Sequence, residues 1–60
     1  MSLQLESHHF FCAGDEVRHR SGTLGRVVDA LSLYAVIRWD DGRQEEVEQL
    51  DPWIVVVERA

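Results

Sequence analysis

The 60-residue sequence predicts an all-β domain, a small five-stranded barrel preceded by a short N-terminal arm. The clearest indication is residues 34–39, an aromatic and β-branched run that ends at Asp40-Asp41-Gly42. Asp-Gly supplies the positive φ values that a tight hairpin turn needs. Similar short runs lie before and after it, with turn residues between them. No stretch repeats apolar residues at helical spacing over a useful length, so we expect no helix.

Residues 1–13 are the expected arm, and residues 14–60 form the expected barrel domain. The arm mixes apolar and polar residues without a clean period, and Phe10 and Phe11 are expected to anchor it to the barrel. A turn at Gly14-Asp15 then leads into the first strand.

The first three strands are expected at about residues 16–20, 24–30 and 34–39. Gly25 lies inside the second strand and suggests a bulge or a sharp bend there. The third strand separates into two faces, because successive side chains point to opposite sides. One face carries Ala35, Ile37 and Trp39, and the other carries Tyr34, Val36 and Arg38.

The fourth and fifth strands are expected at about residues 43–48 and 53–58. The fifth is apolar at every position from Trp53 to Val57. A strand that is apolar on both faces must be covered on both sides, which one small sheet cannot easily do alone. We therefore expect a homo-oligomer, with an interface made by Tyr34, Val36, Trp53, Val55 and Val56.

The composition of the chain indicates where the protein is expected in the cell and which classes of partner are disfavoured. The only cysteine, Cys12, cannot form an intrachain disulfide. No apolar run approaches the ~20 residues that span a bilayer, and residues 1–7 lack the features of a signal peptide. We therefore expect a cytoplasmic protein with no membrane partner. Eleven acidic residues against six basic ones give a formal net charge of −5, which disfavours nucleic acid as a partner.

Several segments resemble the SH3-like small barrels, the group that includes the KOW and Tudor domains. The matching residues are Gly14-Asp15-x-Val17, Gly25-x-Val27, Tyr34-x-x-Ile37-x-Trp39-Asp40-Asp41-Gly42, and the closing strand after Leu50. The resemblance covers about residues 14–57 and implies an SH3-like fold. It implies no single function, because this fold hosts many activities.

Within that group, residues 14–22 resemble the opening of the plasmid-borne type II dihydrofolate reductases, as do Tyr34-Ala35-Val36 and Val57-Glu58-Arg59. Those enzymes are tetramers with one central pore, so the resemblance implies assembly and, as an alternative function, a divergent reductase. Their Val-Gln-Ile-Tyr segment binds folate and nicotinamide, whereas the comparable stretch here is Gln44-Glu45-Glu46-Val47-Glu48. Its carboxylates would repel NADPH and dihydrofolate, which counts against the reaction. The chain also looks like the small barrels encoded by integron gene cassettes.

The favoured function is a small non-catalytic binding module without a cofactor. Its ligand is expected to be cationic or a basic protein segment, bound by Trp39, Asp40, Asp41 and Glu46. An acidic run near the fourth strand could support acid–base catalysis, but no His or Ser lies in a recognised catalytic arrangement with it. The simpler interpretation is a solvated strand face.

Three further arrangements have simpler structural explanations. Trp39, Trp53 and Tyr34 could form a cage for a methylated amine, although packing explains large rings more simply. The alternative of RNA binding would use Arg18, Arg20, Arg26 and Arg38, for which cross-strand ion pairing with Asp29, Glu45 or Glu46 is the simpler role. His8, His9, Cys12 and His19 lack the ligand spacing of a structural zinc site, so no metal is expected.

Overall fold

The computed structural model describes residues 10–60, and most of the predicted arm, residues 1–9, lies outside the described part. The strands are β1 (Glu16–His19), β2 (Leu24–Ala30), β3 (Tyr34–Trp39), β4 (Gln44–Glu48) and β5 (Ile54–Glu58). No helix occurs within residues 10–60. The predicted five-stranded all-β fold is therefore confirmed, and each strand begins and ends within about one residue of its predicted bounds.

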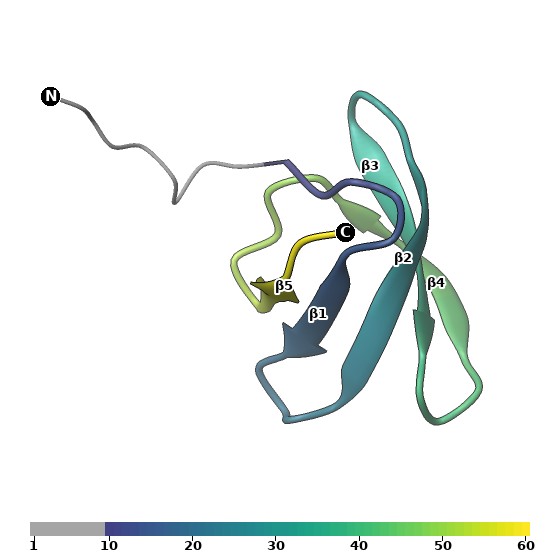
Figure 1. The fold of residues 1–60 in the computed structure, drawn as a ribbon, viewed down its shortest axis with the longest axis vertical. Coiled ribbons are helices and arrows are strands. Elements are labelled where there is room, and N and C mark those ends of the chain that lie inside the picture. The colour runs from purple at the N-terminus through teal and green to yellow at the C-terminus, as the bar shows by residue number, and fades with distance from the viewer. Residues whose placement is uncertain (1–9) are drawn as a thin grey trace, which may run out of the picture.

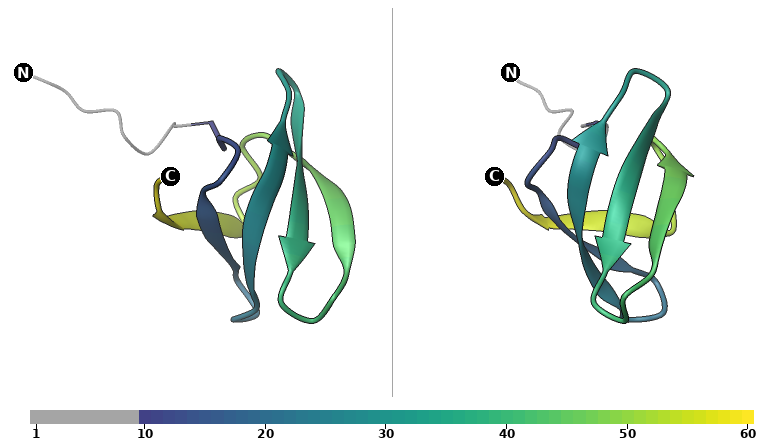
Figure 2. Two further views of the ribbon diagram at one scale, coloured as in Figure 1. Left: turned by 45° about the vertical axis from the view of Figure 1, so that its right-hand side comes forward. Right: turned by 90° about the vertical axis from the view of Figure 1, so that its right-hand side faces the viewer.

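The strands form one antiparallel sheet in the order β4-β3-β2-β1-β5 (Figure 1). Neighbours in sequence are neighbours in the sheet from β1 to β4, and β5 returns to pair with β1. The sheet bends strongly, so that β5 runs across the direction of β2 and β3 (Figure 2). In the described residues β4 and β5 do not pair, so the sheet is not closed and both are edge strands.

One apolar core fills the space inside the bent sheet. It consists of Phe11, Val17, Val27, Ala35, Ile37, Trp39, Val47 and Ile54. In β3 the burial alternates as predicted, with Ala35, Ile37 and Trp39 inside and Tyr34 and Arg38 exposed. The first of the two expected anchors, Phe10, is mostly exposed, whereas Phe11 belongs to the core.

Of the bulge or sharp bend that the sequence suggested at Gly25, the bulge does not occur there. It pairs regularly with Val17 on one side and Trp39 on the other, and the register of β2 shifts between Val27 and Asp29 instead. A Cβ atom at position 25 would lie 2.6 Å from Cε3 of Trp39. Glycine is required there because the indole packs directly against the backbone of β2.

The outer face of β5 is largely uncovered by the described residues. Ile54 is buried, and Val56 is half-buried and packs against the core. Trp53, Val55 and Val57 are 52%, 48% and 45% exposed. Residues 10–60 thus cover only one of the two apolar faces of this strand.

A buried carboxylate joins the two ends of the described chain. Asp15 is 1% exposed, and its Oδ2 accepts hydrogen bonds from Arg59 Nη1 at 2.8 Å and from the Cys12 backbone N–H at 2.9 Å. Its Oδ1 accepts a third from the Ala60 backbone N–H at 3.0 Å. The turn that precedes β1 is therefore fixed to the segment that follows β5.

Candidate binding groove

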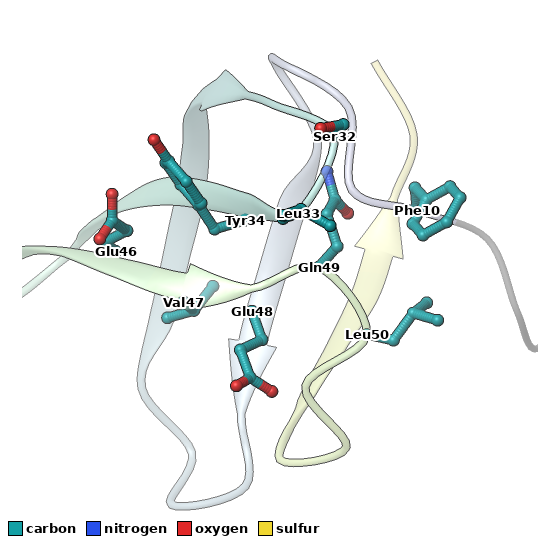
Figure 3. A pocket seen from close by; sticks show the side chains of 9 residues that line it. All are labelled: Phe10, Ser32, Leu33, Tyr34, Glu46, Val47, Glu48, Gln49 and Leu50. Atoms are coloured by element: carbon teal, nitrogen blue, oxygen red, sulfur yellow. The ribbon is translucent and has the colours of Figure 1, made fainter.

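An open groove of about 620 Å³ follows β4 and the start of β3 and continues past the end of β4 (Figure 3). Its walls include Phe10, Leu33, Tyr34, Glu46, Glu48 and Leu50. These residues come from the segment before β1, the β2–β3 loop, two paired strands and the β4–β5 connection. The groove therefore exists only once the sheet has formed.

The register between β3 and β4 explains why the polar side chains of the groove lie on one face of the sheet. Tyr34 pairs with Glu48, and Val36 pairs with Glu46. Directly opposed residues of an antiparallel pair share one face, so both carboxylates and the Tyr34 ring project from the outer face of the sheet. Val47 lies between the two glutamates and faces the core, as strand alternation requires.

Exposed apolar side chains make up the rest of the groove. Leu33 is 78% exposed, and Phe10 and Leu50 are each about half exposed. Phe10 and Leu50 lie at one end of the groove, and Glu46 and Tyr34 lie at the other (Figure 3). Neighbouring exposed apolar groups rimmed by polar ones are typical of interaction sites.

Gln49 holds the parts of the groove together. Its side chain is 95% buried, its Oε1 accepts from the Phe11 backbone N–H at 2.6 Å, and its Nε2 donates to the carbonyl oxygens of Phe11 and Leu31 at 3.2 and 2.9 Å. The backbone N–H of Gln49 also donates to the Leu33 carbonyl oxygen at 3.1 Å. One carboxamide thus fixes the β2–β3 loop and the segment carrying Phe10 against the end of β4.

The charge of the groove has one sign. Glu46 and Glu48 are its carboxylates, and none of the lining residues in the described range 10–60 is basic. Arg38 projects from the same sheet face nearer the hairpin turn, where its Nε and Nη2 donate to Gln44 Oε1 at 3.3 and 3.1 Å. The groove therefore combines apolar contact with an uncompensated negative charge.

The residues predicted to bind a ligand lie in three places. Glu46 is in the groove, whereas Asp40 and Asp41 are in the β3–β4 turn. Trp39 is 2% exposed, and its Nε1 donates to Glu45 Oε1 at 2.7 Å, so its ring belongs to the core. The structure brings Glu46 together with Tyr34 and not with Trp39.

Four of the five residues predicted for an interface lie on two outer surfaces, and the fifth, Val56, does not. Tyr34 and Val36 project from the outer face of β3, beside the groove. Trp53 and Val55 are on the outer side of the β5 segment, and Val56 faces inward.

The three aromatic rings do not enclose one site. Tyr34 and Trp39 project from opposite faces of β3. Trp39 instead meets His19 edge-on, with ring centroids 5.8 Å apart, and His19 lies 6.2 Å from Trp53. The guanidinium carbon of Arg20 lies 4.5 Å above the Trp53 ring. These contacts make a structural cluster at the end of β1.

The cross-strand ion pairs expected for the arginines of the first three predicted strands do not occur. These residues are Arg18, Arg20, Arg26 and Arg38. In the described chain, the salt bridges join Arg43 to Asp41 and Glu45, and Arg59 to Asp15. Arg26 Nη1 donates to the Gly14 carbonyl oxygen at 2.7 Å. Arg26, Arg38 and Arg20 instead contact a carbonyl oxygen, a carboxamide and an aromatic ring, respectively.

The hairpin turn perturbs one carboxyl group. The backbone N–H of Arg43 donates to Asp41 Oδ1 at 2.9 Å, and the Arg43 guanidinium donates to Oδ2 at 2.8 Å. The backbone hydrogen bond is the larger cause and the side chain the second, and together they lower the pKa of Asp41 below its ordinary value. Both contacts stabilise the ionised carboxylate of Asp41.

Reasoning from the sequence missed Leu33, Leu50 and Gln49. The available signal was the apolar segment Leu31-Ser32-Leu33 at a position where a turn is usually polar.

Residues 10–60 contain no cluster of His, Cys, Asp and Glu that could hold a metal ion, and the predicted candidates His8 and His9 lie outside that range. The same range contains no helix that could cross a membrane. Comparisons with protein-family models, with curated proteins and with solved structures found no match to this chain.

Proposed function

We propose that this chain is a small non-catalytic binding module that takes a basic protein segment in the groove along β4. The observation that carries the proposal is the pairing of two carboxylates, Glu46 and Glu48, with the exposed side chains of Leu33, Tyr34 and Leu50. The open five-stranded sheet is compatible with the SH3-like group that the sequence resembles.

Two physical effects favour a basic segment over other ligands. The net charge of −5 attracts cations and repels phosphates at long range, and complementary charge raises the rate of encounter. Lys and Arg also carry long apolar stems, which can cover Leu33 and Leu50 while their charged ends reach the glutamates.

The test uses a fluorescent peptide of sequence Thr-Lys-Val-Lys-Val-Lys-Thr with blocked ends, titrated with the protein and followed by anisotropy. The double variant Glu46→Gln/Glu48→Gln should weaken binding at least about tenfold, because it removes two charge-assisted contacts.

The matched control is Asp40→Asn/Asp41→Asn, which changes the net charge by the same amount at the hairpin turn. If the control weakens binding as much as the groove variant, the effect comes from overall charge and the groove is not the site.

We also propose that the module acts as a homo-oligomer through the outer face of β5. Trp53, Val55 and Val57 leave about half of each side chain in solvent, on a strand whose second edge is open. A second copy would cover both the apolar side chains and the edge.

A further inference from the structure

The free edge of β4 presents its backbone at alternate residues. The Trp39 N–H donates to the Arg43 carbonyl oxygen at 2.7 Å, and the Gln49 N–H donates to the Leu33 carbonyl oxygen at 3.1 Å. In an antiparallel ladder, residues that bond to one neighbour alternate with residues whose N–H and C=O point the other way. Odd-numbered residues of β4 therefore bond to β3, and Gln44, Glu46 and Glu48 direct their backbone groups to the open edge.

The same residues carry the acidic side chains of the groove. Within the described residues, Glu46 thus offers a carboxylate on the outer face and an unpaired backbone N–H and C=O at the edge. Glu48 offers a carboxylate and its backbone N–H, whereas its carbonyl oxygen accepts from the Asp51 N–H at 3.2 Å. A ligand that contacted both the carboxylates and the edge backbone groups would have to be an extended chain. Only a β-strand presents its side chains and backbone groups with the same two-residue period as β4.

We propose that the groove's ligand is an extended segment that adds antiparallel to the edge of β4, with basic residues at alternate positions. This inference rests on the proposed function and specifies its ligand. Two basic side chains would lie opposite Glu46 and Glu48, where cross-strand pairs of opposite charge are favourable. The residue between them would lie beside Val47 at the open edge of the core and is apolar. The recognised pattern is therefore basic–apolar–basic.

A second copy of this chain is a poor occupant of the same edge. Antiparallel pairing of two β4 strands would bring Glu46 and Glu48 against like charges, which is destabilising. Acidic side chains on an edge strand are a common protection against self-pairing. The charge that excludes another β4 strand is the charge that attracts a basic one.

The test places N-methyl groups on the backbone of the peptide Thr-Lys-Val-Lys-Val-Lys-Thr. In the antiparallel register, the central Lys directs its N–H toward β4, whereas each Val directs its N–H to solvent. Methylation of the central Lys should weaken binding at least about tenfold, through a lost hydrogen bond and a steric clash. Methylation of one Val should change binding less than about twofold. Equal loss in both peptides, or loss only at Val, would overturn the proposed register.

A peptide of the same composition but with grouped residues, Thr-Lys-Lys-Lys-Val-Val-Thr, separates the two proposals. If it binds as tightly as the alternating peptide and still depends on Glu46 and Glu48, the groove binds basic segments but strand addition is wrong. If neither peptide binds, both proposals are wrong. Strand addition further predicts that the amide protons of Glu46 and Glu48 exchange more slowly with solvent when the alternating peptide is bound, measured by NMR.

Discussion

At the scale of single residues, two buried polar side chains hold this domain together. Asp15 joins the turn before β1 to Arg59 and Ala60, and Gln49 joins the end of β4 to Phe11 and Leu31. A buried polar group is costly unless its hydrogen bonds are satisfied, so each residue stabilises the fold only with its partners in place. A small domain without a disulfide depends strongly on such connections.

Gln49→Ala should lower the free energy of unfolding by about 2 kcal/mol, because it leaves the buried backbone groups of Phe11 and the partly buried carbonyl oxygen of Leu31 without partners. The control is Gln44→Ala, since Gln44 is exposed and accepts only from Arg38. Gln44→Ala should lower the free energy of unfolding by less than about 1 kcal/mol. Urea unfolding followed by tryptophan fluorescence measures both, and equal losses would contradict the role given to Gln49.

The lowered pKa of Asp41 should prove to have two separate causes, the backbone N–H and the side chain of Arg43. Arg43→Ala removes the guanidinium but keeps the backbone N–H, which is the larger cause of the lowered pKa. The pKa of Asp41 should therefore rise only part of the way to its ordinary value, as measured by NMR of the carboxyl carbon. A full return would show that the side chain alone is responsible.

The sign of the linked effect on stability follows from the direction of this shift. Because the pKa of Asp41 is lower in the folded state, its contribution to stability is present above the unfolded-state pKa. It is lost as the pH falls through the folded-state value. Arg43→Ala should therefore make unfolding less sensitive to pH in the acidic range.

At the scale of elements, β2 organises the sheet. It pairs with β1 along one edge and with β3 along the other, and its register with β3 shifts between Val27 and Asp29. Near its start, Gly25 lets the ring of Trp39 pack against the strand backbone. Trp39, the largest core residue, therefore packs directly on β2, the strand that pairs with both β1 and β3.

Gly25→Ala should destabilise the domain by about 2 kcal/mol or more, because its Cβ would lie 2.6 Å from Trp39 Cε3 and 2.9 Å from Ile37 Cγ2. Val28→Ala on the same strand is the control, since Val28 is 44% exposed and should cost less. Chemical unfolding compares the two. A Gly25→Ala variant as stable as the wild type would mean that the core can move aside.

At the scale of the whole molecule, the two edges of the open sheet differ in character. The β4 edge carries Glu46 and Glu48, whereas the β5 edge is flanked by the apolar side chains of Trp53, Val55 and Val57. The first is protected against self-pairing by charge, and the second has no such protection. This difference favours β4 as the site of the proposed ligand and β5 as the contact of the proposed second copy.

The backbone of β5 specifies how two copies would pair. The Arg20 N–H donates to the Trp53 carbonyl oxygen at 2.7 Å, so residues 53 and 55 bond toward β1 and residues 54 and 56 point to the open edge. Pairing Ile54 with Val56 of a second copy gives partners to the Ile54 carbonyl oxygen and to the Val56 backbone groups, and it replaces the 3.3 Å hydrogen bond from the Ile54 N–H to the Asp51 carbonyl oxygen. This register places the two Val55 side chains opposite each other at the two-fold axis.

In a Cys12→Ser background, Val55→Cys should therefore form a disulfide-linked dimer on mild oxidation, because directly opposed Cβ atoms lie about 5 Å apart. Val57→Cys is the matched control, since the two copies of residue 57 would be about 13 Å apart. Non-reducing electrophoresis measures both.

Light scattering on the wild type should show a mass above that of one chain, and Val55→Glu should lower it. Cross-linking of both cysteine variants alike, or a wild type that is monomeric, would contradict the interface.

Much of the fold was predictable because it depends on local pattern. The alternation in β3 and the Asp-Gly turn were sufficient to place Ala35, Ile37 and Trp39 in the core. The groove itself was not predicted, although the sequence singled out two of its residues, Glu46 for ligand binding and Tyr34 for an interface. Leu33 and Leu50 lie in connecting segments without a period, so no pattern indicated that they would meet.

The sequence by itself determined the class of the fold, the number of strands and the face on which each β3 residue lies, because these follow from the alternation and turn chemistry of adjacent residues. Only the tertiary structure decided that Gly25 serves close packing, that Gln49 is buried, and that β4 rather than the hairpin turn borders a groove. Those features depend on contacts between residues far apart in the chain, which the order of residues alone does not specify.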